Sequence, residues 1–191
     1  MRESFPSLGS TTHISVLDNS AMACSITTSN GEGCGYVVPG TGAMANNFMG
    51  EEDLHPEGFH TQPAGKRLSS MMCPTVVCRD GQPVLVLGTG GSNRIRTAIL
   101  QILVHHLLRH QPIEQVIAAP RLHFEGSRLY VERRGLNNTI LPTSVLETLQ
   151  RHNPETIIFD TPNMFFGGVH AVAAGGHGAG DARRGGAIRV V

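Results

Sequence analysis

The sequence predicts an α+β domain of layered strands and helices, with a β-hairpin first and helices between later strands. Residues 11–26 alternate between apolar and polar side chains, which is the period of a β-strand. Residues 74–87 hold two short apolar runs joined by a turn, and residues 95–106 then repeat apolar side chains at helical spacing. Apolar residues make up 40% of the chain, which is enough for a packed core.

The first half of the chain predicts strands separated by long loops. The alternating stretch begins at Thr11 and is broken by the turn sequence Asp18-Asn19-Ser20, so we expect a β-hairpin. Residues 29–42 and 54–66 are rich in glycine, proline and polar residues, and they predict two loops. Two further strands and the turn between them are expected at residues 74–78, 84–87 and 79–81.

The second half predicts helices between strands. A glycine-rich turn at residues 88–93 leads into the main helix, with Ser92 or Asn93 as its N-cap and Pro112 after its end. In the glycine-rich tail at residues 175–186, Arg183-Arg184 is interpreted as a solvated pair. Short helices are expected at residues 113–119 and 143–152, and strands at residues 129–132, 156–159 and 170–174.

Composition argues against several classes of function. The formal net charge is zero and aromatic residues are only 5%, so neither a basic nor a base-stacking surface for nucleic acid is indicated. No apolar run reaches the roughly 18 residues of a membrane span, and residues 1–10 contain no apolar signal core. The four cysteines, at positions 24, 34, 73 and 78, form no C-x-x-C pair. We therefore expect scattered, partly buried thiols and no metal site. No cofactor is expected either.

Thr11 is the first candidate for chemistry. It begins the first predicted strand, after residues 1–10, which are interpreted as a linker. A β-branched residue there is ordinary in a strand, unless the Ser10–Thr11 bond is cut. Cleavage would give Thr11 a free α-amine with a pKa near ~8, which can take the proton of its own hydroxyl. Thr11 could then act as a nucleophile without a separate base.

The glycine-rich segment at residues 88–92 is the second candidate. Between a strand and a helix N-terminus, its backbone N–H groups could bind an anion. An oxyanion hole and a plain tight turn are both compatible with this pattern. A nucleotide phosphate loop is not favoured, because the G-x-x-x-x-G-K-[ST] pattern and a nearby lysine are missing.

Taken in order along the chain, several motifs resemble the γ-glutamyltranspeptidase family. Together they extend from Thr11 to the C-terminus, and their order is far more specific than any one of them. The motifs are Thr11-Thr12-His13-x-Ser15-Val16-x-Asp18, Ser29-Asn30-Gly31-Glu32-Gly33, Gly42-x-x-x-Asn46-Asn47-x-Met49-Gly50-Glu51-Glu52-Asp53-Leu54, Arg67-Leu68-Ser69-Ser70-Met71-x-x-Pro74-Thr75, Gly88-Thr89-Gly90-Gly91-Ser92, and Gly167-Gly168-Val169-His170 with Gly180-Asp181-x-Arg183-Arg184-Gly185-Gly186.

The resemblance implies the four-layer αββα sandwich of N-terminal-nucleophile hydrolases, of which this chain would be the small-subunit half. Residues 1–10 would precede the self-cleavage site, and residues 11–191 would form the small-subunit-like domain. The implied reaction moves a γ-glutamyl group from glutathione or a related amide to Thr11, and then to water or an amino acid. Hydrolysis and transpeptidation both stay open.

The resemblance also assigns catalytic positions. Thr11 matches the nucleophile, and Ser29 stands where a hydroxyl bonds to it, often that of a threonine. Gly90 and Gly91 match the oxyanion pair, which also contacts the substrate. Thr89, just before them, replaces the more usual proline.

Four further positions match those that bind the donor. Asn30 and Glu51 correspond to the residues that hold the donor α-amino group, with Glu51 in a place often occupied by the shorter aspartate. Ser69 and Ser70 correspond to the pair that bonds the donor α-carboxylate. These types suit a zwitterion, which needs a carboxylate for its ammonium and donors for its carboxylate.

A large subunit, from the same precursor or separately encoded, is the partner that the resemblance implies. Its absence from this chain leaves out an arginine for the donor carboxylate and would expose apolar surface. The missing half would also decide whether the compartment is periplasmic, extracellular or cytoplasmic. Two alternatives stay open: a related acylase acting on cephalosporin or glutaryl amides, and an inactive truncated fragment.

Overall fold

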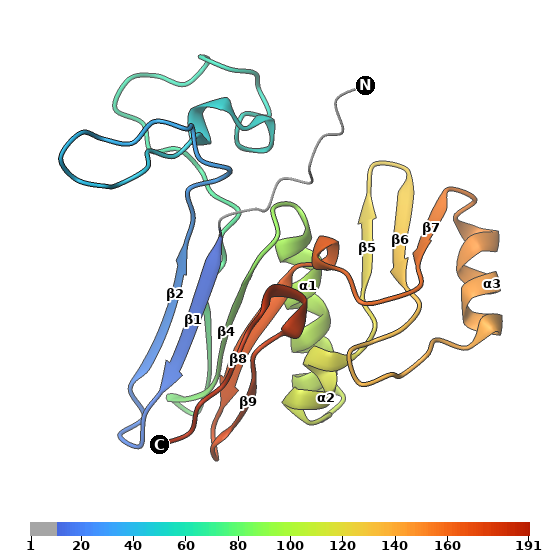
Figure 1. Cartoon of the computed structure of the whole chain (residues 1–191). Coiled ribbons are helices and arrows are strands. Elements are labelled where there is room, and N and C mark those ends of the chain that lie inside the picture. The colour runs from blue at the N-terminus through green and yellow to red at the C-terminus, as the bar shows by residue number, and fades with distance from the viewer. Residues whose placement is uncertain (1–10) are drawn as a thin grey trace.

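A computed structural model describes residues 11–191, which form stacked layers (Figure 1). The predicted linker and the Ser10 side of the predicted cleavage site lie outside the described residues. The hairpin of β1 (Thr12–Leu17) and β2 (Ala23–Thr28) is the first layer. Thr12 faces Thr28 at its open end, and the Asp18 carboxylate closes the turn by accepting two backbone N–H groups. The predicted hairpin is confirmed.

A four-stranded antiparallel sheet forms the second layer. Its order is β3 (Thr75–Arg79), β4 (Gln82–Gly90), β8 (Gly168–Ala173) and β9 (His177–Ala179). The Asp80-Gly81 turn between β3 and β4 has positive φ at both residues, as its sequence predicts. The sheet lies between the hairpin and the helices (Figure 1), so β4 is covered on both faces.

Helices cover the other face of this sheet. They are α1 (Arg94–Leu103), which continues as the π-helical turn η3 (Val104–Leu108), and α2 (Ile113–Ala118). The main core lies between them and the sheet, and its buried members are Leu85, Leu87, Ile95, Ala98, Ile99, Ile102, Ile113, Val116, Ile117, Val169, Ala171 and Ala173. Burial of these apolar side chains is the main stabilising term available to the domain.

A smaller three-stranded sheet lies beyond the helices (Figure 1). It contains β5 (Leu122–Glu125), β6 (Arg128–Glu132) and β7 (Thr156–Phe159), and α3 (Thr143–His152) packs on it through Leu146. Short 3-10 turns complete the fold: η1 (Phe48–Gly50), η2 (Glu52–Leu54), η4 (Met164–Phe166) and η5 (Ala182–Arg184).

Several local predictions are wrong. The glycine turn expected from residue 88 belongs to β4 as far as Gly90, because Gly88, Thr89 and Gly90 pair with β8. Asn93 occupies the N-cap position of α1 without capping it; the Ser92 and Asn93 side chains bond to Asp53 instead. β5 and β9 were not expected.

Two side-chain predictions are also corrected. The four cysteines are free and exposed, whereas partial burial was expected, because they lie on outward faces and loops. Arg183 is buried in ion pairs with Glu132 and Asp181, whereas a solvated tail pair was expected. The carboxylates that bury it come from β6 and from the residue two before it, and hydropathy along the chain does not reveal such a pairing.

Candidate active site

A cavity of about 600 Å³ opens beside the start of β1. Of the eight residues assigned to the site from the sequence, the structure places five on its wall: Thr11, Ser29, Glu51, Ser70 and Gly91. They come from the hairpin, from the loops between β2 and β3, and from the end of β4. Segments far apart in the sequence therefore meet around one space.

Thr11 and Ser29 form the centre of the site. They flank the last residue pair of the hairpin, Thr12 with Thr28, so the register of β1 and β2 sets them side by side. Their hydroxyl oxygens are 2.8 Å apart, and either hydroxyl can donate. The Ser29 hydroxyl also accepts the Gly31 N–H at 3.0 Å, which fixes its position. Both residues line the cavity, so this hydroxyl pair is part of its wall.

Gly90 packs against Thr11, and Gly91, next in the chain, packs against Gly167. The Cβ that an alanine would add at Gly90 would lie 2.8 Å from the Thr11 Cβ. Gly91 has φ +138, and an added Cβ there would lie 3.0 Å from the Gly167 Cα. Only glycine permits this approach of the backbone to Thr11. The structure thus brings the predicted oxyanion residues next to the predicted nucleophile, although Gly90 itself lies behind the cavity wall.

One side of the cavity is acidic. Glu51 lies between η1 and η2, close to Glu32 and Asp53, which also line the cavity. Burial raises the pKa of Glu51, and the two neighbouring carboxylates raise it further. Ser92 and Asn93 donate to Asp53 at 2.6 and 3.1 Å, which ties this loop to the start of α1. A cation, such as an ammonium group, is the ligand that this side would stabilise.

Asn30 and Ser69 do not line the cavity. Both Asn30 and Ser69 are exposed, and the Asn30 side-chain amide donates to the Met44 carbonyl at 3.4 Å. Ser70 does line the cavity, and its hydroxyl accepts the Met72 N–H at 3.1 Å.

Two arginines on the wall were not expected from the sequence. Arg94 lies 4.5 Å from the centre of the Phe165 ring and donates to the Phe165 carbonyl. Burial lowers the pKa of Arg184, and the charge of Arg94 lowers it further. Within residues 11–191, the Arg184 Nε has no hydrogen-bond partner. No spacing signal could have joined these two side chains, because Arg184 is on η5, far along the chain from Arg94, and its side chain packs against Gly168 on β8.

A buried histidine lies beneath the nucleophile. His13 Nδ1 is 2.7 Å from the Thr27 hydroxyl, and Nε2 is 2.8 Å from the Ser15 hydroxyl. Burial, together with the smaller effect of the nearby His170, lowers the pKa of His13 to about 4, so the ring is neutral at neutral pH. A Cβ on Gly88 would lie 2.3 Å from the ring, so this glycine makes room for it.

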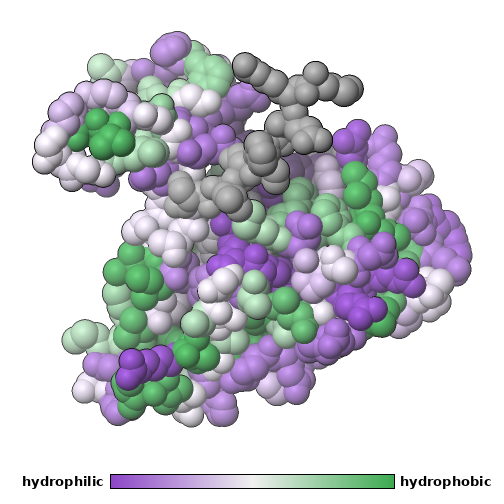
Figure 2. All heavy atoms as spheres, in the orientation of Figure 1, coloured by the Kyte–Doolittle hydropathy of each residue, from purple (hydrophilic) through white to green (hydrophobic). Residues whose placement is uncertain are grey.

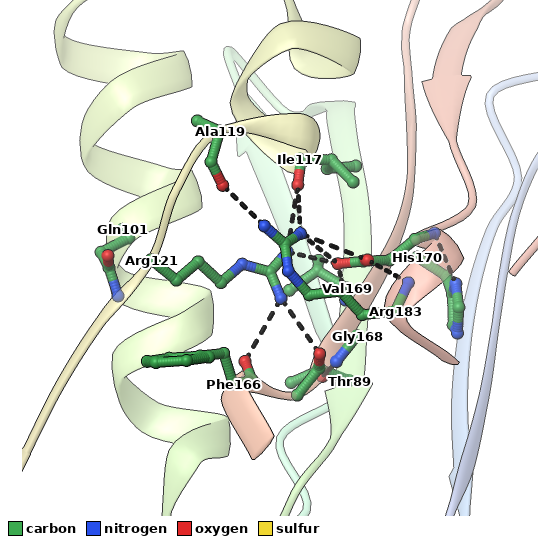
Figure 3. A network of polar contacts seen from close by, with 12 residues as sticks. Thr89, Gln101, Ile117, Ala119, Arg121, Phe166, Gly168, Val169, His170 and Arg183 are labelled. Carbon is green, nitrogen blue, oxygen red and sulfur yellow. Dashed lines mark hydrogen bonds and ion pairs between the residues drawn. The ribbon is translucent and has the colours of Figure 1, made fainter. Parts of the chain in front are cut away.

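A buried ion network supports the wall from behind (Figure 3). Arg183 pairs with Glu132 at 2.6 Å, and Arg121 pairs with Asp181. Arg121 also donates to the Phe166 and Gly167 carbonyls, each at 3.3 Å. Because Gly167 lies against Gly91, these charges hold the segment that confines the site.

Neither a metal centre nor a membrane span is found in residues 11–191. No three His, Cys, Asp or Glu side chains group closely enough there to hold a metal ion. The helices in this part of the chain are also too short or too polar to cross a bilayer. The groups on the cavity wall include hydroxyls, glycine backbone, carboxylates and guanidinium groups.

Comparison with known proteins gives a consistent match. The family model described as Gamma-glutamyltranspeptidase matches residues 2–191. The glutathione hydrolase proenzyme of Pseudomonas aeruginosa is 37% identical over 127 residues, which cover 60% of this chain and 23% of that protein. The Acylase ACY 1 proenzyme of Pseudomonas sp. (strain SE83) is 31% identical over 165 residues, which cover 85% of this chain and 28% of that protein.

Solved structures share the fold. The gamma-glutamyltranspeptidase of Pseudomonas nitroreducens, complexed with L-DON, superposes with a TM-score of 0.76 at 30% identity and covers 94% of this chain and 99% of that one. The cephalosporin acylase of Bacillus halodurans, at 22% identity and a TM-score of 0.69, shares the fold alone.

These matches confirm the predicted fold class, an α+β N-terminal-nucleophile hydrolase fold. The chain spans about a quarter of the length of the curated relatives, at 23% and 28% of the two proenzymes. The chain belongs to the gamma-glutamyltranspeptidase family.

Proposed function

We propose that this chain is the catalytic half of a γ-glutamyl hydrolase or transferase that acts on glutathione and related γ-glutamyl amides. The observation that carries the proposal is the 2.8 Å contact between the Thr11 and Ser29 hydroxyls, on the wall of a cavity shared with Glu51 and Gly91. A nucleophile, a hydroxyl partner, backbone donors and an ammonium-binding carboxylate are the groups that this reaction needs.

The reaction first requires hydrolysis of the Ser10–Thr11 bond: one water molecule is consumed, Ser10 is released with a carboxylate, and the Thr11 amide becomes an amine. The amine takes the hydroxyl proton while Oγ1 attacks the γ-carbonyl carbon. N–H groups of the Gly90–Gly91 segment stabilise the oxyanion. The ammonium then returns the proton to the leaving amine, and water or an amino acid releases the glutamyl group from Oγ1 by the same steps.

The donor is bound through its zwitterionic end. Glu51, in its acidic surroundings, binds the α-ammonium, and Ser70 donates to the α-carboxylate. Asn30 and Ser69 stay in the proposal because they adjoin Gly31 and Ser70, which line the cavity.

A large half completes the enzyme in this proposal. The outer face of the hairpin exposes Ile14, Val16 and Ile26, of which Ile14 is 57% exposed, whereas its inner face carries His13 and Ser15. Figure 2 shows apolar surface gathered over this part of the molecule. Apolar outward residues on a hairpin fit a second protein layer. Co-purification with a tagged large-subunit chain, cut from the same precursor or separately encoded, tests this assignment.

Thr11→Ala is the direct test of the nucleophile. In the paired protein, we expect intact mass to show loss of residues 1–10. We also expect the paired protein to turn over γ-glutamyl-p-nitroanilide. Thr11→Ala should abolish both the cleavage and the turnover. The matched control is Thr12→Ala, next in the chain and exposed, which should keep both. Turnover that persists in Thr11→Ala removes Thr11 from this role.

An acylase activity is the second candidate, favoured by the match to the acylase proenzyme over 85% of the chain, against 60% for the glutathione hydrolase. Glutaryl amides lack the α-amino group that Glu51 would bind. Glu51→Gln should therefore raise KM for γ-glutamyl-p-nitroanilide by about tenfold or more and leave glutaryl-p-nitroanilide unaffected. Faster turnover of the glutaryl substrate by the unaltered protein would favour the acylase.

A further inference from the structure

Thr89 is fully buried between the central sheet and α1, and its hydroxyl makes two hydrogen bonds. It donates to the Gly90 carbonyl at 2.7 Å and accepts the Gly168 N–H at 3.0 Å. Gly90 and Gly168 face each other in the register of β4 and β8. The hydroxyl therefore links the two strands where β4 reaches the cavity.

The Gly90 carbonyl belongs to the same peptide unit as the Gly91 N–H. Because a peptide unit is planar and trans, fixing the direction of the carbonyl fixes the direction of the N–H on the opposite side. A hydrogen bond accepted by the carbonyl also polarises the unit, which makes its N–H a stronger donor. The Thr89 hydroxyl thus acts on an N–H that it does not touch.

The space around this peptide unit leaves little freedom. Gly167 lies against it: a Cβ there would be 2.9 Å from the Gly90 oxygen and 3.1 Å from the Thr89 hydroxyl. On the other side, a Cβ on Gly90 would be 2.8 Å from the Thr11 Cβ. Figure 3 shows Thr89 beside Gly168, next to the network in which Arg121 holds the Gly167 carbonyl.

We propose that Thr89 is a positioning residue for the oxyanion site: its hydroxyl orients and polarises the Gly90–Gly91 peptide so that the Gly91 N–H meets the oxyanion formed at Thr11. This rests on the proposed function, since it takes Thr11 as the nucleophile. The ligand is the negatively charged oxygen of a tetrahedral acyl intermediate. Thr89 itself touches neither the substrate nor Thr11.

Thr89→Val and Thr89→Ser separate the hydroxyl from the shape of the side chain. Valine keeps the branched shape and removes the hydroxyl, whereas serine keeps the hydroxyl and removes the methyl group. Thr75→Val is the matched control: Thr75 lies on β3 of the same sheet, does not line the cavity, and donates to the Cys73 carbonyl at 3.0 Å. If Thr89→Val does not fold, Thr89→Cys replaces it, because a thiol is a weak donor.

Single-turnover acylation by γ-glutamyl-p-nitroanilide is measured in the processed, paired protein. Thr89→Val should lower the acylation rate about tenfold with KM nearly unchanged, less than the ~100-fold or greater loss typical of removing an oxyanion donor itself. Thr89→Ser and Thr75→Val should stay within about threefold of the unaltered protein. A rate retained in Thr89→Val, or lost equally in Thr89→Ser, overturns the proposal.

The Gly91 amide proton shift, measured on the same proteins labelled with 15N-glycine, separates this proposal from the proposed function. Thr89→Val should move the resonance upfield, as expected for a weaker donor, and Thr89→Ser should not. If no substrate acylates the unaltered protein, the proposed function fails. The chemical shift of the Gly91 amide proton then still decides whether Thr89 polarises this peptide. An unmoved resonance in Thr89→Val overturns the inference.

Discussion

The two faces of β4 are built in opposite ways. Toward the helices, Leu85 and Leu87 are completely buried in the main core. Toward the hairpin, Gly88 and Gly90 have no side chains, and His13 and Thr11 occupy the space. The first face stabilises the domain through apolar burial, whereas the second sets distances by letting the backbone come close. The face with less apolar contact is the one that places the chemistry.

Gly90→Ala is the strongest test of this contrast. The added Cβ would lie 2.8 Å from the Thr11 Cβ and 3.0 Å from the Thr11 carbonyl oxygen, so the nucleophile must move. We expect a loss of about 100-fold or more in kcat/KM for γ-glutamyl-p-nitroanilide, with little change in thermal unfolding. The control is Gly50→Ala, at a glycine on the cavity wall where an added Cβ meets nothing within 4 Å. Equal activities of the two variants would contradict the steric argument.

Leu87→Ala tests the opposite face. Removing this fully buried side chain should lower the free energy of unfolding by about 2–5 kcal/mol, because it leaves a cavity in the core. Leu100→Ala, on the solvent side of α1 with the side chain 58% exposed, should change it by less than about 0.5 kcal/mol. Urea denaturation measures both. If Leu87→Ala changes the activation free energy from kcat/KM more than it changes the free energy of unfolding, the division between the two faces is contradicted.

Acid should weaken the hairpin face. The pKa of His13 is about 4 in the folded state and 6.5 in its ordinary state. The unfolded chain therefore binds a proton in this interval that the folded chain does not bind, so stability is complete above pH ~6.5 and falls as the pH drops toward ~4. The His13 contribution is at most about 3 kcal/mol. Denaturation at several pH values measures how the free energy of unfolding depends on pH. Between pH ~4 and ~6.5 this slope should be shallower in His13→Gln than in the unaltered protein. Identical slopes would refute the role of His13 in acid sensitivity.

The sequence predicted elements well where one periodic pattern decides. The hairpin, the helix at Thr143–His152 and the strand at Thr156–Phe159 follow from local alternation or helical spacing. It failed where partners are distant. Gly88 reads as a turn, yet it continues a strand because His13 fills its missing side chain.

The candidate site divides in the same way. Thr11, Ser29, Glu51 and Gly91 meet as the ordered motifs predict. Arg184 could not be placed, because its position depends on Gly168, against which its side chain packs. The roles of all these residues stay predictions until the variants are measured.

The buried network of Arg121, Glu132, Asp181 and Arg183 determines the order in which parts of the domain can fold during synthesis. Arg121 and Asp181 are 60 positions apart, and Glu132 and Arg183 are 51 apart. At roughly 5–20 residues per second, the ribosome makes the later partners several seconds after the earlier ones. Until then the charged groups of Arg121 and Glu132 stay hydrated, because burying them without their partners carries a large desolvation free energy. The helices and β6 therefore cannot close on their native core until the strands that follow have been translated.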